Sequence, residues 1–188
     1  MNAGETRWLD SEQQRAWRAY VIGMTLLNDT LDRELRHAHG LSLAEYEILV
    51  RLSESPNRTL RMAKIADSMQ HSRSRVTHTV TRMEKAGLLE RCAAQGDRRG
   101  VEARMTDKGW ALLVEAAPTH VSGVREHFVD LASDEDFATV GRVMNAVADH
   151  LLAVNPAFAD IREDAEEHIR HGQGPRRSAV AGGAISPE

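Results

Sequence analysis

The sequence predicts a mainly α-helical fold with one small β-hairpin. Apolar residues recur at three- and four-residue steps in six segments of the chain, which is the period of an amphipathic helix. Between the fourth and fifth of these segments, LLERC and VEARM read as two short alternating strands that flank a turn containing Gly96 and Gly100. A length of 188 residues fits one domain with a substantial core better than two independent ones.

The first helix is predicted over residues 11 to 38. Ser11 and Gln14 have the spacing of a capping box at its start, and Gly40 marks its end. One side of this helix is apolar over almost its whole length, at Trp17, Tyr20, Val21, Met24, Leu27, Leu31, Leu35 and Ala38.

The second and third helices are shorter. Ser42 and Glu45 predict a capping box for the second helix, which ends before Pro56, and the third helix is expected to begin near Leu60. The residues expected to face inward are Leu43, Tyr46, Leu49, Val50 and Leu52 in the second helix and Met62, Ile65, Ala66 and Met69 in the third.

The fourth helix is predicted from the cap Ser72 to about Ala86, and Gly87 ends it. Its inward residues are Val76, Val80 and Met83, at four- and three-residue steps. The outward side is therefore polar and basic, with Arg73, Ser74, Arg75, Thr77, His78 and Arg82.

Thr106 caps the fifth helix, in which Pro118 should produce a kink, and Ser133 caps the sixth, which ends at Asn155. The first, fifth and sixth helices are long and apolar along one side, and no sheet covers them. Burial of those sides in a second copy of the chain predicts a homodimer. The apolar residues are Leu112, Leu113, Ala116, Val121, Val124, Phe128 and Leu131 in the fifth helix and Phe137, Val140, Val143, Met144, Val147 and Leu151 in the sixth.

Positive charge is concentrated in the middle of the chain. Residues 58–108 contain 12 Lys and Arg against 6 Asp and Glu, whereas the rest contains 12 against 22. Because a nucleic-acid duplex is a dense line of phosphates, this local excess matters more for its binding than the net charge of −4 of the whole chain. The basic helix and hairpin therefore predict binding to double-stranded DNA.

Several other classes of protein are disfavoured. No apolar stretch approaches the roughly 20 residues that cross a bilayer, and the N-terminus lacks the pattern of a secretion signal. With a single cysteine no internal disulfide is possible, so a cytoplasmic location is expected. No nucleophile elbow, phosphate-binding glycine loop or HExxH motif occurs, so neither an enzyme nor a cofactor is expected.

Two motifs resemble those of a known family. The string DRRGVEARMTDKG is similar to the wing and following helix of MarR-type winged helix-turn-helix regulators, and LRMAKIADSMQHSRSRVTHTVTRMEKAGLLER resembles their helix-turn-helix. The Lys85-Ala86-Gly87-Leu88 helix end and the Thr106-x-x-Gly109 helix start occur in register with both. The resemblance covers roughly residues 8 to 152.

This resemblance implies a winged helix-turn-helix with a helical dimerisation region. Residues 1–41 would form an N-terminal dimerisation helix, 42–108 the DNA-binding lobe and 109–155 the C-terminal dimerisation helices. Residues 156–188 would be a C-terminal extension, disordered from about residue 172 because of its Gly, Ala, Ser and Pro content. In the implied dimer, each subunit places its fourth helix in a major groove and its wing over a minor groove.

The expected DNA contacts follow from side-chain chemistry and from the family pattern. Arg73 and Arg75 suit guanine edges in the major groove, and Arg82 suits the phosphate backbone. The short donors expected at phosphates or base edges are Ser72, Ser74, Thr77 and His78. In the family's wing pattern an aspartate orients an arginine that enters the minor groove, and the matching residues are Asp97 and Arg99, with Arg98 as the neighbouring candidate.

The predicted function is a sequence-specific DNA-binding transcription regulator, a repressor that binds a pseudo-palindromic operator as a homodimer. The alternative is a winged-helix module that binds a partner protein and reads no DNA. The family further implies release of DNA by a small aromatic or anionic effector molecule. Candidates for its cleft are Trp17, Tyr20, Met24 and Tyr46, although the same spacing is typical of plain core residues.

Two further hypotheses concern redox and metal chemistry. Cys92 follows Arg91, whose charge would favour the reactive thiolate and hence redox sensing, whereas a lone cysteine is commonly an inert small hydrophobic residue. The chain has nine histidines, but their spacings match no closed zinc motif, so no metal is expected. The histidines weighed for this role are His37, His39, His120, His127 and His150.

Overall fold

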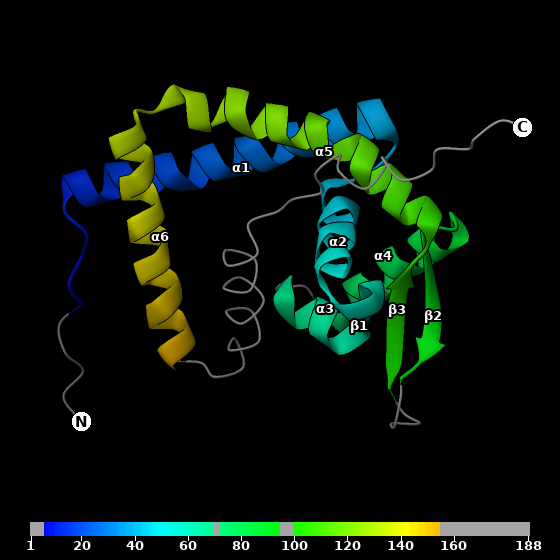
Figure 1. The fold of residues 1–188 in the computed structure, drawn as a ribbon. Coiled ribbons are helices and arrows are strands. Elements are labelled where there is room, and N and C mark those ends of the chain that lie inside the picture. Colours follow the sequence, from blue (N-terminus) through cyan, green and yellow to red (C-terminus); the bar gives the residue numbers. More distant parts are fainter. Residues whose placement is uncertain (1–5, 70–71, 95–99, 155–188) are drawn as a thin grey trace, which may run out of the picture.

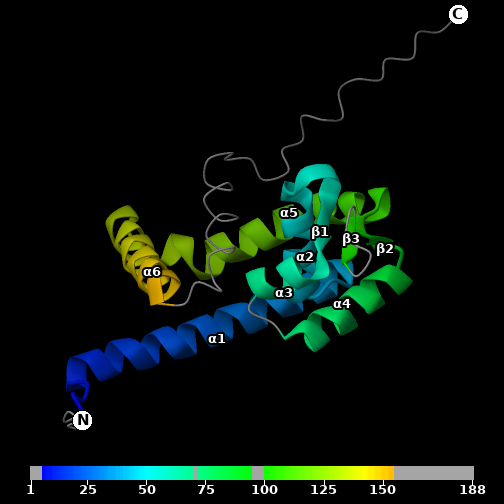
Figure 2. The same ribbon diagram turned by 90° about the horizontal axis from the view of Figure 1, so that it is seen from below.

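The protein consists of a compact lobe attached to long helices (Figure 1). The computed structural model describes residues 6–69, 72–94 and 100–154. Helix α1 (Ser11–His39) packs against α5 (Asp107–His127), and α6 (Asp134–Val154) follows α5 after a short 3₁₀ turn at Val129–Leu131. The lobe is built between α1 and α5 in the sequence, and it lies at one end of α1 (Figures 1 and 2).

Helix α1 has nearly the predicted bounds but a different cap. The Asp10 carboxylate accepts hydrogen bonds from the backbone N–H groups of Glu12 and Gln13, and the Gln13 side chain accepts one from the N–H of Asp10. The capping box is thus Asp10 with Gln13, and the predicted pair Ser11 and Gln14 is wrong by one residue. The helix ends, as predicted, at Gly40, whose φ of 66° is readily adopted only by glycine.

The lobe contains three helices, α2 (Leu43–Glu54), α3 (Met62–Ser68) and α4 (Arg73–Lys85). Both caps predicted here are confirmed. Ser42 and Glu45 form the capping box of α2, and the Ser72 hydroxyl accepts a hydrogen bond from the N–H of Arg75 at the start of α4. Helices α3 and α4 form the helix-turn-helix.

The hairpin strands β2 (Leu89–Ala93) and β3 (Val101–Met105) are confirmed, and a third strand joins them. Strand β1 (Thr59–Arg61) pairs with β3, so that the antiparallel sheet has the order β1-β3-β2. This strand was not predicted, and it delays the start of α3 from the expected Leu60 to Met62. Asn57 and Arg58 precede β1 with φ values of 54° and 53° and turn the chain sharply out of α2.

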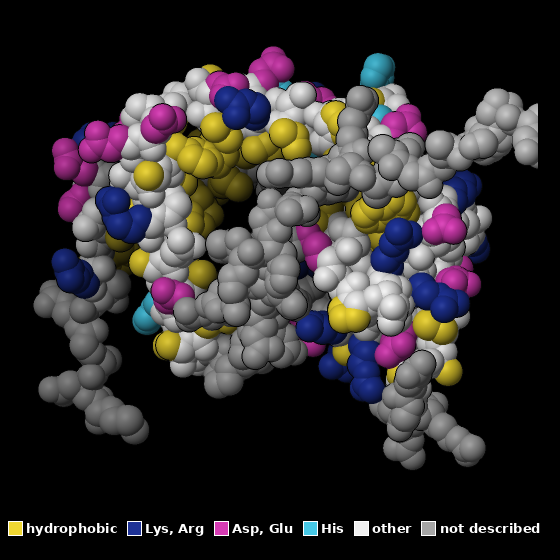
Figure 3. Space-filling model, viewed as in Figure 1, with side chains coloured by type: hydrophobic (Ala, Val, Ile, Leu, Met, Phe, Trp, Pro, Cys, Tyr) yellow, Lys and Arg dark blue, Asp and Glu magenta, His cyan; other side chains and the backbone are white. Residues whose placement is uncertain are grey.

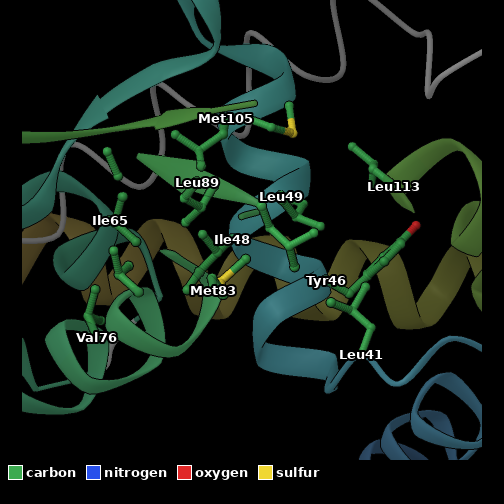
Figure 4. Close-up of a cluster of buried hydrophobic side chains, with 14 of the residues drawn as sticks. Leu41, Tyr46, Ile48, Leu49, Ile65, Val76, Met83, Leu89, Met105 and Leu113 are labelled. Carbon is green, nitrogen blue, oxygen red and sulfur yellow. The ribbon is translucent and has the colours of Figure 1, made fainter. Parts of the chain in front are cut away.

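The core of the lobe surrounds α2 (Figure 4). Ile48 and Leu49 are almost fully buried in its centre. Residues from α3, α4, the sheet and the first half of α5 pack around them, including Ile65, Val76, Met83, Leu89, Met105 and Leu113. All three residues predicted to face inward from α4 are buried, which leaves the polar side of this helix at the surface.

The apolar sides of the long helices are largely uncovered in the protomer. In α1 only Leu31 and Leu35 are buried, whereas Trp17, Tyr20 and Val21 are 58%, 43% and 41% exposed. Helix α6 has no buried residue, and its exposed apolar residues include Phe137, Val140, Val143, Met144, Val147 and Leu151. Figure 3 shows hydrophobic side chains along the inner sides of these helices. The predicted stripes therefore exist, but the protomer alone does not bury them.

Candidate nucleic-acid interface

The predicted recognition residues of α4 form one exposed surface. Ser72, Arg73, Ser74, Arg75, Thr77 and His78 are all exposed. Within the part of the chain that the structure describes, neither Arg73 nor Arg75 forms an ion pair. Arg75 does act on a nearby acid, because its charge partly offsets the rise that burial causes in the pKa of Glu47. In the space-filling view Lys and Arg side chains gather over the lobe (Figure 3). The structure thus brings these predicted residues together on a cationic surface.

Arg82 differs from the other predicted residues because its guanidinium already has protein partners. Its Nε lies 2.7 Å from Glu45 Oε1, and its Nη2 lies 3.4 Å from Ser42 Oγ. Burial alone would raise the pKa of Glu45, but hydrogen bonds from Ser42 and Arg82 outweigh it and lower the pKa below its ordinary value. Glu45 is therefore a stable anion, and Arg82 is its counterion.

Arg91 is a structural residue that the sequence did not reveal. It extends from β2 across α4, where its Nη1 lies 2.7 Å from Glu84 Oε2. Its Nη2 donates hydrogen bonds to the Thr77 carbonyl at 3.1 Å and the Thr81 hydroxyl at 2.8 Å. This side chain fixes the wing to the recognition helix. No spacing in the sequence signals the contact, because it depends on how a strand lies across a helix.

The end of α4 is held by residues from the start of α5. The Lys108 ammonium donates a hydrogen bond to the Ala86 carbonyl at 2.7 Å, and the Thr106 hydroxyl donates one to the Gly87 carbonyl at 2.7 Å. Gly87 has a φ of 74°, and a Cβ on Gly109 would lie 2.3 Å from the Leu88 carbonyl oxygen. The two glycines noted in the sequence therefore meet two different needs, a left-handed turn and a close approach of backbones.

The base of the wing is described, but its tip is not. Arg104 in β3 pairs with Glu90 in β2, with an Nε–Oε1 distance of 2.7 Å. The predicted minor-groove residues Asp97, Arg98 and Arg99 lie outside the described residues, as does the C-terminal extension, residues 156–188. Their roles stay predictions.

The four residues proposed for an effector cleft lie on α1 and α2 and have different surroundings in the protomer. Trp17 and Tyr20 stack on each other with ring centroids 5.9 Å apart on the exposed part of α1. Met24 is half-buried on the same helix, but Tyr46 lies in the core of the lobe, against His120 at 4.5 Å. A different groove lies between α1 and α5, lined by Glu34, His37, Ala38, Pro118, Thr119, Ser122, Gly123 and Glu126.

Arg91 and Cys92 have different partners in the structure. Arg91 directs its guanidinium to α4, whereas the half-buried Cys92 thiol lies 3.9 Å from the Glu102 carbonyl oxygen of the adjacent strand. Successive residues of a strand point to opposite faces, so the two side chains diverge. The printed contacts therefore do not pair Arg91 with Cys92, and redox sensing by Cys92 stays a prediction.

Three of the histidines connect helices. His39 in α1 lies 2.8 Å from the Thr119 hydroxyl of α5, and His127 in α5 lies 2.7 Å from Glu34 of α1. His120 packs on Tyr46. Over residues 6–69, 72–94 and 100–154, no group of three or more His, Cys, Asp or Glu side chains is arranged to hold a metal ion. No helix in the same ranges has the length and apolarity to cross a membrane.

Comparison with known proteins extends this picture. The family model described as "MarR family" matches residues 39–100. The HTH-type transcriptional regulator MhqR of Bacillus subtilis (strain 168) is 30% identical over 58% of this chain and 73% of its own length. The HTH-type transcriptional regulator PecS of Dickeya dadantii (strain 3937) is 28% identical over 70% of this chain and 82% of its own length.

Solved structures from Streptomyces coelicolor are similar over most of the chain. Sco3205, a MarR family transcriptional regulator solved in complex with DNA, is 41% identical, with a TM-score of 0.75 over 79% of this chain and 92% of that one. AbsC, also a MarR family transcriptional regulator, is 40% identical, with a TM-score of 0.73 over 79% of this chain and 99% of that one.

Proposed function

From the premise that this chain belongs to the MarR family, whose members are transcriptional regulators and not enzymes, we propose a specific function for it. The protein is a repressor that binds a pseudo-palindromic operator as a homodimer. Its expected location is the cytoplasm. The observation that carries the proposal is the exposed start of α4, where neither Arg73 nor Arg75 forms an ion pair within 4 Å among the described residues. An arginine at such a position can donate two parallel hydrogen bonds to guanine O6 and N7.

The dimer is supported by the uncovered apolar sides of α1 and α6. A second copy that covers them would present a second recognition helix. Two such helices related by a twofold axis would meet major grooves about one turn apart, roughly 34–36 Å, which requires an inverted repeat. The similarity to Sco3205, which was solved with DNA, supports duplex DNA as the ligand.

Selection of bound sequences from a pool of random duplexes tests the proposal. The enriched sequences should contain an inverted repeat, and its affinity should fall steeply with salt because bound phosphates release counterions. An Arg75→Ala variant should lose about 1–3 kcal/mol of discrimination at one base position of each half-site. Equal losses on operator and random DNA would contradict base reading by Arg75.

The second candidate function is docking of a partner protein by the same winged helix. Charge-reversal variants at Arg73 and Arg75 distinguish the two functions. Repression through an operator requires that both variants lose duplex binding. A protein interaction that is insensitive to salt and survives both changes would support docking instead.

We propose that binding of a small molecule is the signal that releases the protein from DNA. The family resemblance suggests an aromatic or anionic effector, and oxidation of Cys92 is the alternative signal. Treatment with peroxide separates the two, because a Cys92→Ser variant should escape the effect of oxidation but should still respond to a small molecule. Unchanged operator affinity after peroxide treatment would remove the redox hypothesis.

A further inference from the structure

A buried carboxylate connects the recognition helix to the rest of the protein. The Glu45 side chain is 9% exposed. Its Oε2 accepts hydrogen bonds from the Ser42 backbone N–H at 2.9 Å and the Ser42 hydroxyl at 2.6 Å, and its Oε1 accepts one from Arg82 Nε at 2.7 Å. The capping box of α2 is thus extended by a residue of α4, 37 positions later in the chain.

The same turn of α2 is also bound from α1. The N–H of Leu43, in the first turn of α2, has no acceptor within its own helix, and it donates a hydrogen bond to Asp32 Oδ1 at 2.8 Å. The other oxygen of Asp32 lies 2.5 Å from Arg36 Nε. Asp32, Ser42, Glu45 and Arg82 therefore form a continuous polar network from α1 through α2 to α4, here called the α1–α2–α4 network.

The position of Arg82 in α4 gives this network a functional consequence. Arg82 follows Arg75 by seven residues, which is about two helical turns, so both side chains emerge from nearly the same side of α4. A contact of Arg82 with Glu45 adds to the buried residues Val76, Val80 and Met83, which also set the rotation of α4 about its axis. That rotation determines the direction in which Arg75 leaves the helix.

We propose that Arg82 is a positioning residue for base reading, and that the α1–α2–α4 network holds α4 at the rotation that Arg75 needs. Arg82 then acts through Glu45 and supplies no phosphate contact of its own. This inference rests on the proposed function of operator binding. It differs from the interpretation of Arg82 as a backbone contact, because Nε and Nη2 of this half-exposed side chain are bonded to Glu45 and Ser42.

Substitution of Arg82 by lysine separates the two roles. Lysine keeps the positive charge and binds phosphate well, but it lacks the fork that reaches Glu45 and Ser42 together. The positioning role predicts that Arg82→Lys weakens operator binding at least about tenfold and leaves random-sequence binding and its salt dependence unchanged. A phosphate contact predicts the opposite, that Arg82→Lys binds the operator almost normally.

The Glu45→Gln variant provides the second arm of the experiment. It removes the anion that holds Arg82 and leaves the side chains of Arg73 and Arg75 unchanged. It should lose operator discrimination as Arg82→Lys does, and the double variant should lose no more than either single variant, because both changes break one interaction. The matched control is Arg33→Gln on α1, which breaks an exposed ion pair with Asp29 and should leave operator binding intact.

Each outcome has a defined meaning. Circular dichroism of each free variant shows whether it is folded, and if Glu45→Gln does not fold, Arg82→Lys alone decides the question. The inference would be overturned if Arg82→Lys lost equal affinity for operator and random DNA and Glu45→Gln lost none. The proposed function would then still stand. Wild-type protein that binds no duplex would overturn both.

Discussion

Arg91 and Arg104 lie in paired strands of the same hairpin, and each forms an ion pair with a glutamate, yet their surroundings differ. Arg91 is 27% exposed and adds hydrogen bonds to the Thr77 carbonyl and the Thr81 hydroxyl. Arg104 and its partner Glu90 are both 51% exposed. Solvent screens an exposed pair strongly, so the two arginines should differ in their contribution to stability.

An Arg91→Met variant should lower the free energy of unfolding by about 1.5–3 kcal/mol, because charged hydrogen bonds across α4 are lost. The matched Arg104→Met variant should lower it much less, because solvent screens its exposed pair with Glu90. Urea denaturation of both variants measures the difference. Equal losses would show that Arg91 does not fix the wing to α4.

His120 makes stability depend on pH. Burial lowers the pKa of His120 below its ordinary value of 6.5, and burial raises the pKa of the adjacent Tyr46 to about 12, so Tyr46 stays neutral. The unfolded chain therefore binds a proton at His120 more readily than the folded chain. The contribution of neutral His120 to stability is complete above about pH 6.5. It decreases as the pH falls from there towards the pKa of His120 in the folded protein.

Denaturation at pH 7.5 and pH 5.5 tests this expectation. The wild type should lose more stability between the two pH values than a His120→Phe variant, which keeps an aromatic ring against Tyr46 but cannot be protonated. An identical loss in both proteins would mean that His120 is not the group responsible.

At the scale of elements, the start of α5 leaves no room for a side chain at Gly109. Alanine at position 109 would gain helix propensity, but its Cβ would lie 2.3 Å from the Leu88 carbonyl oxygen and 3.0 Å from Met105 Cγ. The cost of this overpacking should exceed the gain in helix propensity, so Gly109→Ala is expected to destabilise the protein by about 1–3 kcal/mol. Gly23→Ala in α1, where nothing lies within 4 Å, should instead stabilise it by about 0.5–1 kcal/mol. Thermal or urea denaturation of both variants checks the sign of each effect.

Local signals explain which elements could be predicted from the sequence. Caps and terminal glycines act within one helical turn, so the bounds of α1, α2 and α4 were predicted to within a residue or two. Strand β1 could not be predicted, because its partner is distant in the sequence, with Leu60 paired to Ala103. The α1 cap was misplaced because Asp10 and Ser11 are both good caps, and only the hydrogen bonds distinguish them.

In the candidate site, too, local sequence signals predicted exposure but not contacts between distant elements. Exposure of Arg73 and Arg75 followed from the periodicity of α4, since the buried positions Val76, Val80 and Met83 leave them outside. The partners of Arg82 and Arg91 depend on how α2 and β2 pack against α4, and no spacing along one element encodes that packing. Periodicity therefore predicted that α4 exposes Arg73 and Arg75, but not that Arg82 and Arg91 have partners within the protein.

At the scale of the whole molecule, the exposed apolar side of α6 makes dimerisation testable. A Val147→Glu variant should be monomeric in sedimentation analysis, because a charge cannot be buried in an apolar interface without a partner. It should also lose operator binding, since two half-sites can no longer be bound together. Asn145→Glu, on the opposite side of α6, should remain dimeric. Monomeric wild-type protein would contradict the proposed assembly.

Helix α1 is long and is held in the protomer only near its C-terminal end. The helix has 29 residues, and only Leu31 and Leu35 near its C-terminal end are buried. At about 1.5 Å per residue its length is roughly 43 Å, so a tilt of about 5° at the anchored end moves the far end by roughly 4 Å. That displacement exceeds the spacing of about 3.4 Å between successive nucleotides along a strand. In the proposed dimer, joined through the uncovered part of α1, a small tilt of this helix caused by a bound molecule would therefore shift the two recognition helices relative to successive major grooves.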